Sequence, residues 1–146
     1  MAEKPAELAN LVRIGKLAAE PGARGEIEGL VTSGVERLAD ARNERLALSS
    51  RFDLAYNAAH AFSLAALRWH GYRSENRFLV FQLLSVTLGI PDPTWRVLAK
   101  AHQVRNTAEY EGHFEADATL VRNLIDAAEA VRAAIAALPA LPRSAW

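Results

Sequence analysis

The chain has 146 residues, which suits one domain with its own core and is too short for two large ones. Hydrophobic residues make up 51% and charged residues 23%, and this composition excludes a disordered chain. The 17 basic and 17 acidic residues cancel, so the chain lacks the basic excess of proteins that coat duplex nucleic acid.

Cysteine is absent, which excludes disulfides, thiolate metal sites and a cysteine nucleophile. The first twenty residues contain no long apolar run after their early charges, so no signal peptide is expected. No run of about eighteen consecutive apolar residues occurs, and nothing is expected to span a membrane. We therefore expect a soluble cytoplasmic protein without membrane contact.

The spacing of apolar residues predicts helices almost throughout the chain. Residues 5–20 form a short candidate helix, and the stretch "PGARG" separates it from the rest. The next helix is predicted over "GEIEGLVTSGVERLADA", residues 25–41. Glycine is costly inside a helix, by about 1 kcal/mol relative to alanine, so its three glycines indicate that a neighbouring helix comes close. These glycines are Gly25, Gly29 and Gly34.

The clearest helical pattern is "SSRFDLAYNAAHAFSLAALRWHGYR", residues 49–73. Ser49 or Ser50 is the predicted N-cap, and Gly71 is a natural stop. The predicted buried seam steps by three and four residues through Phe52, Ala55, Ala59, Phe62, Ala66 and Trp69. A second face carries Tyr56, His60, Leu67 and His70, and two histidines without a nearby carboxylate pair make a poor metal site.

Three further patterns complete the chain. One helix is predicted from a cap at Ser74 to a stop at Gly89 and Pro91, with Phe78, Phe81, Leu84 and Leu88 as its buried stripe. Another opens with Asp92 as cap and Pro93 at the first helical position, and ends at Gly112. The last begins near Asp117 and ends before Pro139, with Leu120, Leu124, Ala127, Val131, Ile135 and Leu138 as its apolar stripe.

These patterns predict an all-α fold, an up-and-down bundle of about five helices without a strand. Residues 1–22 are assigned to an N-terminal helical extension, residues 23–139 to the bundle and residues 140–146 to a loose tail.

Polar chemistry is concentrated in "AHQVRNTAEYEGH", residues 101–113. On a helix, His102, Arg105 and Glu109 share one face, and His102, Asn106 and Tyr110 share an overlapping one. Arginine can clamp a phosphate with paired hydrogen bonds, and histidine can move a proton near neutral pH. Such a set suits attack of a ribose 2′-hydroxyl on its own phosphate, a reaction that requires no metal.

The same residues also have ordinary structural interpretations. Arg105 and Glu109 are spaced for an ion pair across one helical turn. His102 can be a packed histidine, and Asn106 and Tyr110 can bond to each other or to the helix end. His113 follows Gly112 and can be a loop residue without a role. The sequence leaves the two interpretations open.

Three stretches together, "RLADA", "RFDLAYNAAHAFSLAALRWHGYR" and "VRNTAEYEG", resemble the prokaryotic HEPN superfamily. Members of this superfamily are small helical bundles that often dimerise. The resemblance covers residues 30–131, and its most specific part is the pair Arg105 and Asn106 followed by an aromatic residue near a helix end. In the family motif a histidine follows the arginine several residues later. Here Tyr110 stands in that interval and His113 lies just beyond it.

The resemblance implies two alternatives. The first is an RNA- or nucleotide-binding homodimer, which in its enzymatic form is a metal-independent ribonuclease of the toxin-antitoxin or defence type. The second is a non-catalytic helical interaction module that partners a nucleotidyltransferase or another toxin-antitoxin component. No cofactor and no metal is expected in either.

In the enzymatic alternative, Arg105 stabilises the phosphorane and Asn106 positions it, with assistance from Tyr110 or His113. The predicted RNA-binding residues are His102, Lys100, Arg73 and Arg77. A positive cleft requires that the basic residues Arg68, Arg73, Arg77, Lys100 and Arg105 converge in the fold.

Overall fold

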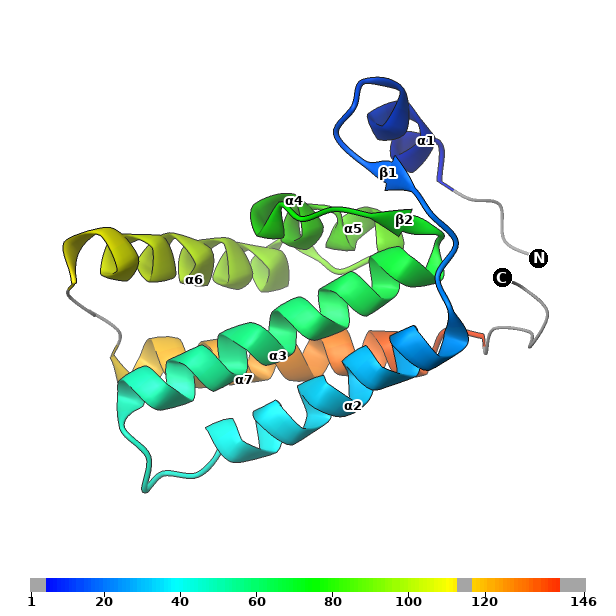
Figure 1. Cartoon of the computed structure of the whole chain (residues 1–146). Helices are drawn as coiled ribbons and strands as arrows, with labels where there is room; N and C mark the ends of the chain where they lie inside the picture. The colour runs from blue at the N-terminus through cyan, green and yellow to red at the C-terminus, as the bar shows by residue number, and fades with distance from the viewer. Residues whose placement is uncertain (1–4, 113–116, 140–146) are drawn as a thin grey trace.

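The structure, a computed structural model, describes residues 5–112 and 117–139. Its helices are α1 (Ala6–Arg13), α2 (Arg24–Ala41), α3 (Leu48–Trp69), α4 (Arg77–Gln82), α5 (Leu84–Thr87), α6 (Asp92–Glu111) and α7 (Ala118–Ala136), and its strands are β1 (Ala18–Ala19) and β2 (Tyr72–Arg73). The all-α helical bundle predicted from the sequence is confirmed (Figure 1).

The four long helices α2, α3, α6 and α7 alternate in direction along the chain (Figure 1). Helix α3 lies at the centre, with α2 and α7 packed along its length. Helix α6 lies beside α4 on the other side of α3, and its contacts with α7 are fewer than those of α3. The bundle therefore has a dense α2–α3–α7 half and a more open half around α6.

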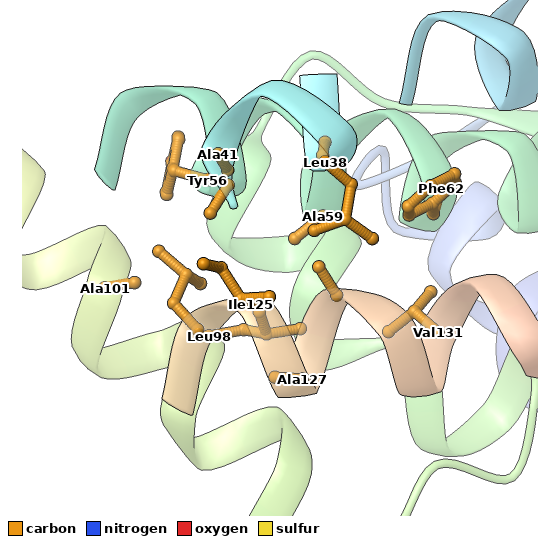
Figure 2. Packing of buried hydrophobic residues seen from close by; sticks show 14 of the residues in the cluster. Leu38, Ala41, Tyr56, Ala59, Phe62, Leu98, Ala101, Ile125, Ala127 and Val131 are labelled. Atoms are coloured by element: carbon orange, nitrogen blue, oxygen red, sulfur yellow. The ribbon is translucent and has the colours of Figure 1, made fainter. Parts of the chain in front are cut away.

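Small residues allow α2 and α3 to come close. A Cβ atom placed on Gly34 of α2 would lie 2.5 Å from Cε1 of Phe62, so only glycine fits there. This confirms the close approach expected from the α2 glycines, although a Cβ on Gly25 or Gly29 would meet nothing within 4 Å. Phe62, Leu38 and Ala59 lie together in the core, facing Ile125 and Val131 of α7 (Figure 2).

The helix predicted from Ser74 to Pro91 is interrupted, and that prediction is wrong in detail. Two short helices, α4 and α5, meet at Leu83 instead. The segment buries residues in two directions, because Phe81 and Leu84 join the main core while Val80 and Leu83 join a second cluster around Leu8 of α1. A single straight helix with one apolar stripe cannot serve both clusters.

Phe78 also departs from its predicted buried position, because it remains 38% exposed at the start of α4. The N-cap of this helix is Asn76, whose Oδ1 accepts from the Leu79 amide at 3.0 Å. Ser74 Oγ instead accepts from the Asn76 amide, so the predicted serine cap lies two residues too early.

Of the other predicted helix ends, some are confirmed and some are wrong. Gly112 ends α6 in the left-handed conformation with φ of 65°, and Asp117 caps α7 through the Leu120 amide at 2.8 Å. Neither Ser49 nor Ser50 caps α3, which begins at Leu48 without a side-chain cap. Asp92 is already inside α6, after an N-cap at Pro91.

A short strand pair joins the N-terminal segment to the bundle, in contrast to the strand-free fold predicted. Ala18 pairs with Arg73 and Ala19 with Tyr72 in antiparallel register. The pairing follows from Gly71, whose φ of 89° turns the chain back after α3.

Arg68 of α3 anchors the same segment. Its side chain is only 4% exposed, and it donates to the carbonyls of Glu20, Pro21 and Tyr72 and to the Glu26 carboxylate at 2.6 Å. The described part of the segment assigned from the sequence to an extension, residues 5–22, thus touches the bundle through α1 and β1.

Within residues 5–112 and 117–139, none of the helices is both long enough and apolar enough to cross a bilayer. The predicted tail, residues 140–146, lies outside the described part of the chain.

Candidate functional site

The second half of α6 is less deeply buried than the first. Leu98 and Ala101 in the first half are fully buried, whereas no residue from 102 to 111 is buried. This stretch therefore presents its polar side chains at the surface of the open half of the bundle. Pro93 in the first turn and Gly112 at the end explain why the helix begins and ends where it does.

His102 connects α6 to α3 through one hydrogen bond, and a second bond joins it to Asn106 within α6. Its Nε2 lies 3.1 Å from Asn106 Nδ2, and its Nδ1 lies 3.0 Å from Tyr56 Oη. Because the Asn106 amide nitrogen can only donate, Nε2 is the acceptor and the ring proton resides on Nδ1. His102 therefore donates to the buried hydroxyl of Tyr56.

Two arginines from different helices converge on the same aromatic ring. The guanidinium carbon of Arg105 in α6 lies 5.0 Å from the Tyr56 ring centroid, and that of Arg77 in α4 lies 5.7 Å from it. Arg77 is also held by Asn57, whose Oδ1 accepts from its Nη1 at 3.1 Å. Cation–π contact places both positive groups beside one buried ring, although two like charges repel each other.

One acidic residue balances part of this charge. Arg105 Nη2 lies 3.1 Å from Glu109 Oε1, an ion pair across one helical turn as the sequence allowed. The Arg105 side chain is 29% exposed and that of Glu109 is 55% exposed, so water screens this pair. Among the residues described, Arg77 makes no ion pair.

The nearby titratable groups respond to burial and to the two arginines. Burial lowers the pKa of His102, and Arg105 and Arg77 lower it further. The pKa of His60 falls to about 4, again through burial first and then through the same arginines. Burial also raises the pKa of the Asp53 carboxyl. Both histidines are thus neutral at pH 7, and the positive charge of the site comes from the arginines.

Two hollows flank this polar cluster. The first, of about 680 Å³, lies between α4 and α6 and is bordered by Phe78, Lys100, His102, Asn106 and Tyr110. The second, of about 450 Å³, lies between α3 and α6 and is bordered by Asp53, Asn57, Arg105 and Glu109. Volumes of this order suit small ligands or parts of larger ones.

The structure brings together Arg105, Asn106, His102 and Arg77 among the predicted site residues. Lys100 lies farther along the first hollow, and Tyr110 borders it with 90% of its surface exposed. Arg73 lies apart on β2, where it pairs with Glu20. His113 lies outside the described residues.

The expected convergence of five basic residues is therefore only partial. Arg68 is buried with Glu26 and Arg73 is paired with Glu20, so neither joins the cluster. The positively charged surface is therefore smaller than the one predicted from the sequence. It consists of Arg77 and Arg105, with Lys100 nearby.

Tyr56 and Asn57 belong to the candidate site but are not predicted from the sequence. The helical pattern puts Tyr56 on a second face of its helix and indicates no role for it. The sequence does contain a signal for these two residues, because a phenol and an amide stand next to each other in an alanine-rich helix. Polar groups that such a helix buries require hydrogen-bond partners.

No group of three or more histidine, aspartate or glutamate side chains within the described ranges is arranged to hold a metal ion. Comparison with known proteins found no matching family model, no matching curated protein and no matching solved structure.

Proposed function

We propose that this chain is a HEPN-like protein that binds the phosphates of RNA or of a nucleotide and acts as a homodimer. The observation that carries the proposal is the convergence of Arg77 and Arg105 over Tyr56. Two guanidinium groups beside one ring carry positive charge that a bound anion can neutralise, and phosphate oxygens match the paired donors of arginine.

The neighbouring residues fit this chemistry. His102 is neutral at pH 7, so it can accept a proton, and its Nε2 is held by Asn106 at the edge of the first hollow. In the enzymatic form of the proposal, Arg105 and Arg77 neutralise the negative charge that develops on the phosphoryl oxygens during attack by the 2′-hydroxyl. Asn106 positions the phosphate, and Tyr110 stands at the open side.

RNA binding and cleavage test this proposal in one experiment. The purified protein is incubated with a mixed RNA pool in EDTA, beside the Arg105→Ala, Asn106→Ala double variant. The matched control is Arg122→Ala, which removes an exposed arginine from α7. We expect the double variant to lose RNA binding and the control to retain it. Metal-free cleavage lost in the double variant identifies a ribonuclease, whereas a folded wild type that binds no RNA overturns the proposal.

A second candidate function is the non-catalytic interaction module that partners a nucleotidyltransferase or another toxin-antitoxin component. The ion pair between Arg105 and Glu109 favours it, because an arginine paired within its own chain is less available to a phosphate. Glu109→Gln separates the two functions. At a phosphate site, loss of this carboxylate raises RNA affinity a few-fold, and at a purely structural pair RNA affinity does not change.

The homodimer is tested by sedimentation equilibrium of the wild type over a range of protein concentrations. A mass of twice 15.9 kDa that persists on dilution supports it. A monomer at all concentrations, with RNA binding intact, removes the dimer from the proposal.

A further inference from the structure

The first hollow has a feature that the phosphate proposal does not use. Two aromatic residues, Phe78 of α4 and Tyr110 of α6, border it with 38% and 90% of their surfaces exposed. Aromatic rings are usually buried, because each removes a large apolar area from water. An exposed pair around one hollow therefore suggests a flat apolar ligand.

Phe78 is held in place from two sides. Its ring centroid lies 6.2 Å from that of Trp95 at an interplanar angle of 70°, and 5.6 Å from that of His102 at 50°. A ring fixed by its neighbours offers a surface that loses little freedom on binding. Tyr110 lies one helical turn beyond Asn106.

The rest of the lining combines hydrogen-bonding groups with positive charge. Gln103 and Asn106 carry amides and Thr107 a hydroxyl, so both donors and acceptors border the hollow. Arg96 and Lys100 supply positive charge, against Glu111 as the acidic residue of the lining. Amides read the edges of nucleobases, and aromatic side chains stack on their faces.

We propose that the hollow between Phe78 and Tyr110 binds an unstacked nucleobase of the same RNA or nucleotide whose phosphate the proposed function assigns to Arg77 and Arg105. This inference rests on the proposed function, because it identifies the part of the RNA or nucleotide that the site recognises beyond its phosphate. His102 and Asn106 connect the two parts, since they border the hollow and link through Tyr56 to Arg105 and Arg77.

Two probes separate base recognition from phosphate binding. One is a fluorescein-labelled single-stranded RNA, and the other is an abasic ribose-phosphate chain of the same length, both measured at one fixed salt concentration. We expect the wild type to bind the RNA more tightly than the abasic chain. Tyr110→Ala should weaken RNA binding about 5- to 150-fold, the range for loss of one base–aromatic stack, and leave abasic binding unchanged.

Control variants keep the test specific. Tyr110→Phe retains the ring and should retain RNA affinity, and Ile14→Ala removes another exposed apolar side chain from a distant part of the chain and should have no effect. Phe78→Ala should also weaken RNA binding alone, with circular dichroism used to verify that the variant is folded.

The outcomes distinguish this inference from the function on which it rests. Equal affinity for the two probes, or equal loss of both in Tyr110→Ala, overturns the base site and leaves phosphate binding standing. Absence of binding to either probe overturns the proposed function and this inference with it. Adenosine monophosphate as competitor identifies the source of the base: displacement of the RNA at micromolar concentration indicates a free nucleotide, and retained RNA binding indicates RNA.

Discussion

Tyr56 Oη lies 3.0 Å from His102 Nδ1, a contact that joins the central helix α3 to the open helix α6. The Tyr56 side chain is fully buried and the His102 side chain is partly buried. This hydrogen bond therefore fixes His102, at the centre of the candidate site, to the core of the bundle. Its direction follows from Asn106, because a donating amide at Nε2 leaves the ring proton on Nδ1.

Tyr56→Phe tests this contact directly. The variant keeps the ring under both arginines and removes only the hydroxyl, so the His102 N–H loses its acceptor. We expect the free energy of unfolding to fall by about 1 kcal/mol, the usual net effect of one hydrogen bond. Urea denaturation measures this change. In the wild type, ¹⁵N spectra of the imidazole should show the proton on Nδ1, and a proton on Nε2 would contradict the proposed orientation.

Arg68 is expected to matter for stability far more than Arg73. Arg68→Met leaves three carbonyls and the half-exposed Glu26 carboxylate without their donor, whose own side chain is buried. We expect a loss of about 3 kcal/mol in unfolding free energy, as for other broken buried charge networks. Arg73→Met removes an exposed partner of Glu20 and serves as the matched control, with little change expected. Equal melting temperatures of the two variants would refute this assignment.

Gly34 and Gly29 of α2 should respond to alanine in opposite directions. Gly34→Ala forces a methyl group to within 2.5 Å of Phe62, and overpacking of this kind destabilises by about 1–3 kcal/mol. Gly29→Ala meets no atom within 4 Å and gains helix propensity, so it should stabilise by roughly 0.5–1 kcal/mol. Thermal unfolding of the pair measures both effects. Similar values for the two variants would mean that α2 and α3 are not in close contact at Gly34.

His60 should make stability depend on pH. Its pKa is about 4 in the folded protein and about 6.5 when unfolded, so the unfolded chain binds more protons between these values. Stability is therefore greatest above pH 6.5 and is lost as the pH falls toward 4. Between pH 7.5 and pH 5 this group alone should remove about 2 kcal/mol. Urea denaturation of the wild type and His60→Gln at both pH values measures it, and an identical pH dependence of the two would exclude His60 as the cause.

Local sequence rules determined much of this protein. Apolar spacing predicted the four long helices, and Gly112 and Asp117 marked helix ends correctly, whereas the caps predicted at Ser74 and Asp92 were wrong. The same rules brought out Arg105, Asn106 and His102 as a polar set on one helix, since residues three and four apart share a face.

The tertiary structure decided which residues pack against each helix face. Periodicity shows that a face is buried or polar but does not name its partner, and Tyr56 reaches His102 from 46 positions away in the chain. In the sequence, Arg68 and Arg77 are equivalent basic residues. Packing buries the first against Glu26 and places the second beside Tyr56, because the bundle sets which helices are neighbours. The break between α4 and α5 has the same origin. It lets this segment contribute side chains to two hydrophobic clusters, and these clusters exist only in the folded chain.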